Sequence, residues 1–286
     1  MSVRWSVAAL WVLLGSVLAL AGSPTPLAQV PAPSETTERP AEEACALIWV
    51  DREAEFEAFL RTAEVTRMKS VPVGVTQPSR AYFGPGGLAE SMAWKAIPPG
   101  IRNGFFESYR SEIAAYELDR LLGLHMVPPT VERQVNRETG AAVLWASPTH
   151  SFGDLGGVPG QGRVPGPPSA RVPEWTRQVV RAKMFDNLIA NSDPNLGNWL
   201  VDNDWHLILI DHSRSFTGMK TLTHKMDHID RPLWEKFLAL DEASLEAVVG
   251  SWMGRRELRA ILSRRDAMAQ QIARMVKQRG ESVFIK

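Results

Sequence analysis

The fold is decided by residues 183–216, which read KMFDNLIANSDPNLGNWLVDNDWHLILIDHSRSF. The apolar run at 184–189 predicts the end of a buried helix. Two β-favouring runs follow, at 199–201 and 205–210, and the Asp-Asn-Asp sequence between them suits a turn. A hairpin is therefore expected directly after the helix and its loop.

Three polar residues stand at fixed places in this segment. Asn198 follows Asp193 by five positions, and Asp211 follows Asn198 by thirteen. Protein kinases carry a catalytic-loop aspartate, a metal-binding asparagine and a metal-binding aspartate in this order. The pattern predicts that Asp193 orients an attacking hydroxyl and that Asn198 and Asp211 hold a divalent metal. The alternative interpretation is a series of ordinary turns, in which such side chains bond to nearby backbone.

The composition is that of a folded and electrically balanced chain. Its 286 residues allow one large or two small domains, and 44% of them are hydrophobic. Lysine and arginine number 32, as do aspartate and glutamate, so no net charge favours nucleic acid, and no nucleic-acid partner is expected. The single cysteine, Cys45, excludes an intrachain disulfide and a cysteine-rich zinc site.

The N-terminus has the character of a targeting segment. Residues 1–22 contain one charge, Arg4, and the small-x-small pattern Ala19-Leu20-Ala21. They predict a signal peptide and export to the periplasm or the cell exterior. The alternative is an uncleaved membrane anchor formed by residues 5–21. Residues 23–43, with five prolines, predict an unfolded linker.

A glycine turn and a lysine follow the first predicted strands. Residues 71–83 have β-favouring composition interrupted by prolines, and alternation predicts a further strand over 90–97. Gly86 and Gly87 lie in the turn between them, and Lys95 lies near the end of the second run. In a nucleotide site, backbone amides at such a turn approach phosphates and a strand lysine neutralises them. Both features also occur in hairpins that bind nothing.

A helix is expected at 108–122, closed by Gly123, after an earlier helix at 53–63. Kinases pair the strand lysine with a glutamate of such a helix. Helical periodicity favours Glu117 as this partner, whereas comparison of motifs favours Glu112, which we adopt.

A hinge, an irregular loop and further helices are expected in the rest of the chain. Residues 130–146 predict two strands that lead into a hinge at 145–149, where an adenine ring would lie. Residues 151–173 hold six glycines and five prolines and predict an irregular loop at the cleft mouth. Helices are expected within 233–249 and over 255–278.

Several blocks of sequence together carry a family resemblance. They are SEIAAY at 111–116, Asp119-Arg120, VPP at 127–129, MFD at 184–186, NSD at 191–193 and DHSRSF at 211–216. These blocks resemble the secretory-pathway kinases typified by Golgi casein kinase and xylosylkinase, over roughly residues 71–280. The pattern Asp193-x4-Asn198-Trp199-Leu200, followed by Ile210-Asp211, is also similar to type II phosphatidylinositol 4-kinases.

The resemblance implies an α+β, two-lobed protein-kinase-like fold. A small β-rich N-lobe with one key helix would occupy 44–149, and a mostly helical C-lobe would occupy 150–286. It implies ATP and Mg²⁺ or Mn²⁺ as cofactors, and a protein, glycan or inositol lipid as the hydroxyl-bearing acceptor. Lys95 would contact phosphate, and Glu112 would pair with Lys95 or reach the metal. Asp193 would orient the acceptor.

Three departures from the ordinary protein-kinase pattern qualify this interpretation. Ser192 stands where ordinary kinases have arginine, Pro194 follows Asp193, and His212-Ser213 replace Phe-Gly after the metal-binding aspartate. An inactive relative would keep the same fold. The sequence therefore leaves a nucleotide-binding pseudokinase, acting as a scaffold, as the second functional hypothesis.

Overall fold

The computed structural model describes residues 46–71, 78–193 and 195–285. All of them lie in one compact unit of the chain. The signal peptide or anchor predicted at 1–22 and the linker predicted at 23–43 fall outside the described residues. Within the described part of the chain, no helix combines the length and apolar character that crossing a membrane requires.

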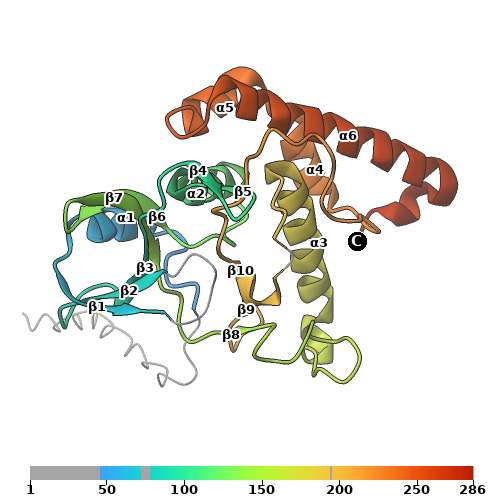
Figure 1. Ribbon diagram of the computed structural model, residues 1–286. Coiled ribbons are helices and arrows are strands. Elements are labelled where there is room, and N and C mark those ends of the chain that lie inside the picture. Colours follow the sequence, from blue (N-terminus) through green and yellow to red (C-terminus); the bar gives the residue numbers. More distant parts are fainter. Residues whose placement is uncertain (1–45, 72–77, 194, 286) are drawn as a thin grey trace, which may run out of the picture. The chain divides into compact units, whose positions relative to one another are not determined.

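A five-stranded antiparallel sheet holds the strand lysine (Figure 1). Its strand order is β1-β2-β3-β7-β6. The strands are β1 (Val65–Ser70), β2 (Ser79–Phe83), β3 (Ser91–Lys95), β6 (Thr130–Val135) and β7 (Glu138–Leu144). Lys95 ends β3, which lies in the middle of the sheet, so strands on both sides hold its backbone in place.

Two helices pack against this sheet, α1 (Glu53–Thr62) and α2 (Tyr109–Leu122). Alternate residues of β7 pack on the α1 side and on the α2 side, because successive side chains of a strand point to opposite faces of the sheet. Ala141 and Val143 pack with Ile113 of α2, whereas Ala142 and Leu144 share a core cluster with α1. The sheet is therefore covered on both sides.

The ends of α2 follow from local sequence. The Ser108 hydroxyl accepts a hydrogen bond from the Arg110 amide at 3.1 Å, which caps the first turn. Gly123 ends the helix with a left-handed φ of 61°. Between β3 and α2 lies a short hairpin that the sequence did not predict, β4 (Gly100–Arg102) and β5 (Phe105–Glu107).

Helices dominate the second half of the chain (Figure 1). They are α3 (Val172–Ile189), α4 (Arg231–Leu238), α5 (Glu242–Val249) and α6 (Arg255–Arg279). A three-stranded sheet accompanies them, with β8 (His150–Ser151), β9 (Trp199–Val201) and β10 (Leu207–Leu209) in the order β10-β9-β8. One large hydrophobic cluster joins these elements, built around residues such as Phe185, Leu209 and Ile261. The predicted helix, loop and hairpin of 183–216 are all present.

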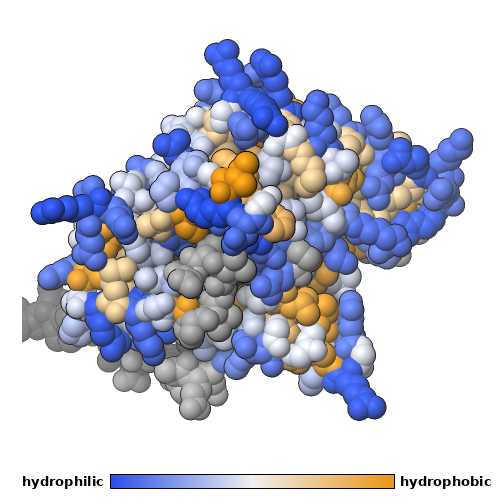
Figure 2. Space-filling view, viewed as in Figure 1, coloured by the Kyte–Doolittle hydropathy of each residue, from blue (hydrophilic) through white to orange (hydrophobic). Residues whose placement is uncertain are grey.

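The visible surface is mostly hydrophilic, with hydrophobic residues in small patches (Figure 2). One patch lies over the β4–β5 hairpin, where Ile101, Phe105 and Phe106 are 78%, 49% and 42% exposed. Irregular backbone fills most of 151–173, as predicted, apart from the first residue in β8, the 3₁₀ turn at Ser169–Arg171 and the first turn of α3. The boundary between lobes at 149 and 150 stays a prediction.

Candidate active site

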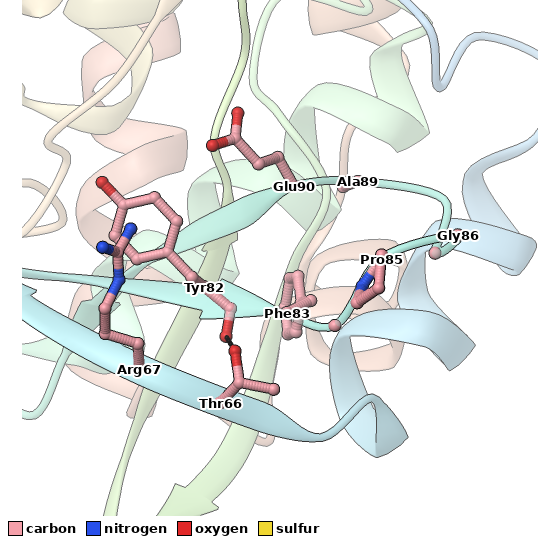
Figure 3. Close-up of a pocket in the computed structure, with 10 residues that line it drawn as sticks. Thr66, Arg67, Tyr82, Phe83, Pro85, Gly86, Ala89 and Glu90 are labelled. Atoms are coloured by element: carbon pink, nitrogen blue, oxygen red, sulfur yellow. Dashed lines mark hydrogen bonds between the residues drawn. The ribbon is translucent and has the colours of Figure 1, made fainter.

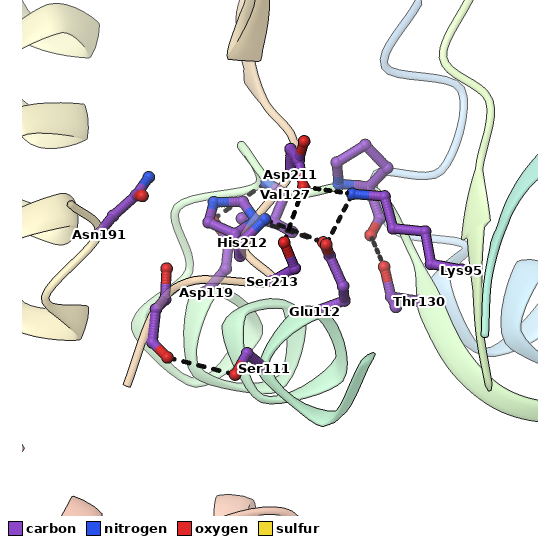
Figure 4. A network of polar contacts seen from close by, with 12 residues as sticks. Lys95, Ser111, Glu112, Asp119, Val127, Thr130, Asn191, Asp211, His212 and Ser213 are labelled. Carbon is purple, nitrogen blue, oxygen red and sulfur yellow. Dashed lines mark hydrogen bonds and ion pairs between the residues drawn. The ribbon is translucent and has the colours of Figure 1, made fainter. Parts of the chain in front are cut away.

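Lys95 lies at the centre of a buried network of charges (Figure 4). Its Nζ is 2.6 Å from Glu112 Oε1 and 2.8 Å from Asp211 Oδ1, and its side chain is 6% exposed. The structure thus pairs Lys95 with Glu112, the partner adopted from the sequence. Glu117 instead pairs with Arg120 at 3.0 Å.

The contacts of Lys95 favour the charged forms of Lys95 and Asp211. Burial by itself disfavours the ammonium of Lys95, but the carboxylates of Asp211 and Glu112 outweigh it and raise the Lys95 pKa. Burial likewise acts against the Asp211 carboxylate, yet Lys95 and the Ser213 hydroxyl hold its pKa below the ordinary value. Lysine and aspartate therefore keep each other ionised.

Asp211 is placed by strand β10 and by an unusual backbone conformation. The Ile210 amide, just before it, donates to the Asn198 carbonyl at 3.0 Å, which ties the two predicted metal-binding segments together. Asp211 itself has a φ of 61°, a left-handed conformation that non-glycine residues rarely adopt. Lys95 and Ser213 both bond to its Oδ1, so among the described residues Oδ2 has no hydrogen-bond partner.

The predicted catalytic and metal-binding residues line one cavity with Lys95. It measures about 450 Å³, and its lining includes Lys95, Asp193, Asn198 and Asp211. Residues of the hinge predicted at 145–149 also line this cavity. This volume falls in the range of small-molecule sites. Lys95 and Asp211 therefore line the same cavity although they lie 116 positions apart in the sequence.

The donor set suits a divalent ion held jointly with phosphates. Asn198 is buried, and its amide nitrogen lacks a hydrogen-bond partner among the residues described. Outside the masked segments, no three His, Cys, Asp or Glu side chains gather as a metal cluster. Mg²⁺ is commonly held by one or two protein oxygens together with substrate phosphates. The amide oxygen of Asn198 and Oδ2 of Asp211 fit that arrangement.

Gly86 and Gly87, which were predicted to contact nucleotide, are not among the residues that line this cavity. Both residues line a separate surface hollow around the β2–β3 turn (Figure 3). Ser79 pairs with Trp94 across these strands, so the turn lies at the opposite end of the hairpin from Lys95. Val71 and Pro78, from the β1–β2 connection, line the cavity instead. Sequence alone did not distinguish which end of the β2–β3 hairpin lies at the cavity.

Arg214 is a further residue of the site, one that was not predicted from the sequence. This arginine lines the cavity and lies 3.5 Å from Asp193, between Nη1 and Oδ2. Its main partner is Glu107, more than a hundred positions away, so no local spacing connects the two residues.

No protein-family model and no curated protein matches this chain. Solved structures do. Hydra Fam20 with sugar is 14% identical, with a TM-score of 0.60 over 81% of this chain and 91% of that one. The Golgi casein kinase with Mn/ADP bound is 13% identical, with a TM-score of 0.56 over 82% and 78%. The Helicobacter pylori proinflammatory kinase CtkA is 12% identical, with a TM-score of 0.50 over 78% and 98%.

The likeness covers about four fifths of this chain, and at these identities it concerns the fold. It confirms the predicted α+β, two-lobed kinase-like fold. This chain has the fold of the atypical kinases that include Fam20 and the Golgi casein kinase.

Proposed function

We propose that the protein is an ATP-dependent kinase that transfers the γ-phosphoryl group to an alcohol hydroxyl. One observation carries the proposal. Lys95 is ion-paired with both Glu112 and Asp211 in the cavity that Asp193 and Asn198 also line. A protein that served only as a scaffold would have no physical need to hold all five groups together.

Each group has a definite part in the proposed reaction. Lys95 binds phosphate oxygens of ATP, and Glu112 keeps Lys95 in place. Asp193 accepts the proton of the acceptor hydroxyl as the acceptor oxygen forms a bond to the γ-phosphorus. The bond from that phosphorus to the bridging oxygen breaks, and ADP leaves with the electron pair. When bound, Mg²⁺ or Mn²⁺ held by Asn198 and Asp211 neutralises charge on the phosphates.

The structural neighbours support the ligand classes in this proposal. The Golgi casein kinase structure contains Mn and ADP, and the hydra Fam20 structure contains a sugar. They motivate ATP with a divalent metal as cofactors here, and a protein, a glycan or an inositol lipid as the acceptor. We also propose that the domain is exported, or is held at a membrane by residues 5–21. Sequencing of the mature N-terminus tests this part.

Phosphoryl transfer from γ-labelled ATP tests the activity. The purified protein is incubated with Mg²⁺ or Mn²⁺ and with three kinds of acceptor: acidic protein, glycan, and vesicles containing phosphatidylinositol. Asp193→Ala and Asp211→Ala should each lower the transfer rate by at least about a hundredfold. Asp227→Asn, at an exposed aspartate, is the matched control and should retain the wild-type rate.

The same assay separates the two functional hypotheses. Label transfer by the wild type that both variants lose would establish the kinase. Nucleotide-induced thermal stabilisation with no label in any acceptor, or in the protein itself, would identify a pseudokinase instead.

A further inference from the structure

We propose that Arg214 is a positioning residue for Asp193, held in place by Glu107 and Phe105 of strand β5. The inference deepens the proposed kinase function and rests on it. It assigns a role to an arginine outside the set of residues that the sequence pattern marks as catalytic.

Glu107 fixes the guanidinium from one side. Nε and Nη2 of Arg214 lie 2.9 Å and 2.8 Å from Oε1 of Glu107. The Glu107 side chain is 3% exposed and that of Arg214 is 14% exposed, so water competes little for these contacts. A planar guanidinium bound along one edge has a defined orientation, unlike a flexible ammonium group.

The β4–β5 hairpin supplies the rest of the support. Phe105 lies under the guanidinium, with the Arg214 Cζ 4.5 Å from the ring centroid. The backbone joins the same elements, because the Ser108 amide donates to the Ser213 carbonyl at 2.9 Å. The Ser111 hydroxyl donates to the Ser215 carbonyl at 3.2 Å. The short hairpin and the start of α2 are thus fastened to the segment that carries Arg214.

The edge of the guanidinium that remains faces Asp193. Nη1 lies 3.5 Å from Asp193 Oδ2, while the other oxygen, Oδ1, accepts the Asn195 amide at 3.2 Å. Oδ1 of Asp193 is therefore held by a backbone amide of its own loop, and Oδ2 is attracted by the positive charge of Arg214. This arrangement restrains rotation of the carboxylate about its χ2 bond.

The loop itself has no cation for this purpose. Residues 191–198 read NSDPNLGN, without lysine or arginine. The charged residues lining the cavity are Lys95 and Arg214 against Asp154, Asp193 and Asp211. Lys95 is engaged by Asp211, so Arg214 is the cation that the structure directs at Asp193.

Kinetics of three variants test the proposal. Arg214→Met removes the charge, Arg214→Lys keeps the charge without the planar fork, and Glu107→Gln weakens the clamp. A misplacement of a catalytic group by about 1 Å can cost about a hundredfold in rate. We expect Arg214→Met to lower kcat about ten- to hundredfold, with Arg214→Lys and Glu107→Gln in between. The Kd of ADP with Mn²⁺, measured by calorimetry, should change less than about threefold, because Arg214 acts on Asp193 and not on the nucleotide.

Arg231 offers a matched control on the opposite part of the fold. It also pairs with a glutamate, Glu281, and stacks on a phenylalanine, Phe284, at 3.7 Å. Arg231→Met removes the same kinds of contact at a more exposed site, where the side chains of Arg231 and Glu281 are 46% and 77% exposed, and should leave kcat unchanged. Melting temperatures identify any variant that fails to fold, and the milder Arg214→Lys and Glu107→Gln variants then decide.

The outcomes distinguish a failure of the positioning role of Arg214 from a failure of the proposed kinase function. A wild-type protein that transfers no phosphoryl group overturns the kinase function and the role of Arg214 together. A wild type that is active beside equally active Arg214 and Glu107 variants overturns only the positioning role. A nucleotide Kd that weakens as much as kcat falls also overturns it, because Arg214 would then be a nucleotide ligand.

Addition of guanidinium to an Arg214→Ala variant gives a further readout. Partial recovery of kcat at millimolar guanidinium, absent with the Asp193→Ala variant, would support the role. A merely structural arginine would show no recovery.

Discussion

At the scale of single residues, Lys95 is the cation that pairs with both the buried carboxylate of Glu112 and the partly buried carboxylate of Asp211. Glu112 is 3% exposed, so Lys95→Met leaves a charge without its partner. Breaking a buried pair in this way typically costs about 3–5 kcal/mol. We expect a loss of this size in the free energy of urea unfolding, together with loss of phosphoryl transfer. Lys69→Met, at an exposed position of β1, is the control and should change neither.

A free energy of unfolding for Lys95→Met within about 0.5 kcal/mol of the wild type would contradict this prediction. It would mean that the ion pairs of Lys95 contribute little to stability. The control variant separates this result from a general effect of removing one lysine.

Asp119 makes a pH-dependent contribution to stability. Burial raises the pKa of its carboxyl to about 8, although Oδ1 accepts backbone amides of Met126 and Val127. The unfolded value is about 4, so the folded protein holds an extra proton between these two values. The contribution of this proton to the free energy of unfolding is complete below about pH 4. It decreases by up to about 1.4 kcal/mol per pH unit as pH rises, and it is lost once pH has risen through about 8.

Asp119→Asn keeps the Oδ1 acceptor and removes the titration. The stability of the variant relative to the wild type should therefore increase from about pH 5 to about pH 8, measured by urea unfolding. Parallel stability curves for the two proteins would show that Asp119 is ionised in the folded state throughout this range.

At the scale of elements, β7 determines where β3 places Lys95. A Cβ atom at Gly140 would lie 2.5 Å from the Lys95 carbonyl oxygen and 2.8 Å from the Ala96 Cα. Gly140→Ala must displace the end of β3, at about 1–3 kcal/mol of overpacking. We expect lower stability and a smaller thermal shift with nucleotide.

Gly84→Ala is the matched control for this substitution. Its Cβ would meet only the Thr66 methyl group, at an ordinary 3.9 Å. The control should keep both stability and nucleotide response. If Gly140→Ala behaves the same way, the position of Lys95 does not depend on the β3–β7 contact.

Elements with local signals could be predicted from the sequence. Helix α2 begins and ends within a residue of its expected limits, because Ser108 and Gly123 act on their own turns. Hairpin β9–β10 was expected from its apolar runs. The β4–β5 hairpin was missed, because strands of three residues are too short to show a period.

Parts of the site that depend on distant pairing were harder to predict. The order Asp193, Asn198 and Asp211 lies within one segment, so spacing alone indicated it. The glycine turn lies between β2 and β3 as expected, but composition does not reveal that it lines a hollow other than the cavity of Lys95. The Arg214–Glu107 contact spans 107 positions and left no pattern to read.

At the scale of the whole molecule, the cavity depends on segments that only the complete fold brings together. Lys95 comes from the large sheet, Glu112 from α2 and Asp211 from the end of β10. A ligand that contacts all of them stabilises the folded protein as a unit, because the unfolded chain has no such site.

ATP with Mn²⁺ should therefore raise the melting temperature in a way that requires both components. At a concentration a hundredfold above Kd, binding adds about 2.7 kcal/mol, or roughly 5–10 °C for a chain of this size. Excess EDTA should remove most of the shift. Asp211→Asn should reduce it as well, since Oδ2 of Asp211 and the amide oxygen of Asn198 are the groups proposed to hold the metal. Asp227→Asn should keep the full shift. An Asp211→Asn protein with the full metal-dependent shift would place the metal elsewhere, because the comparison concerns the shift and not the starting melting temperature.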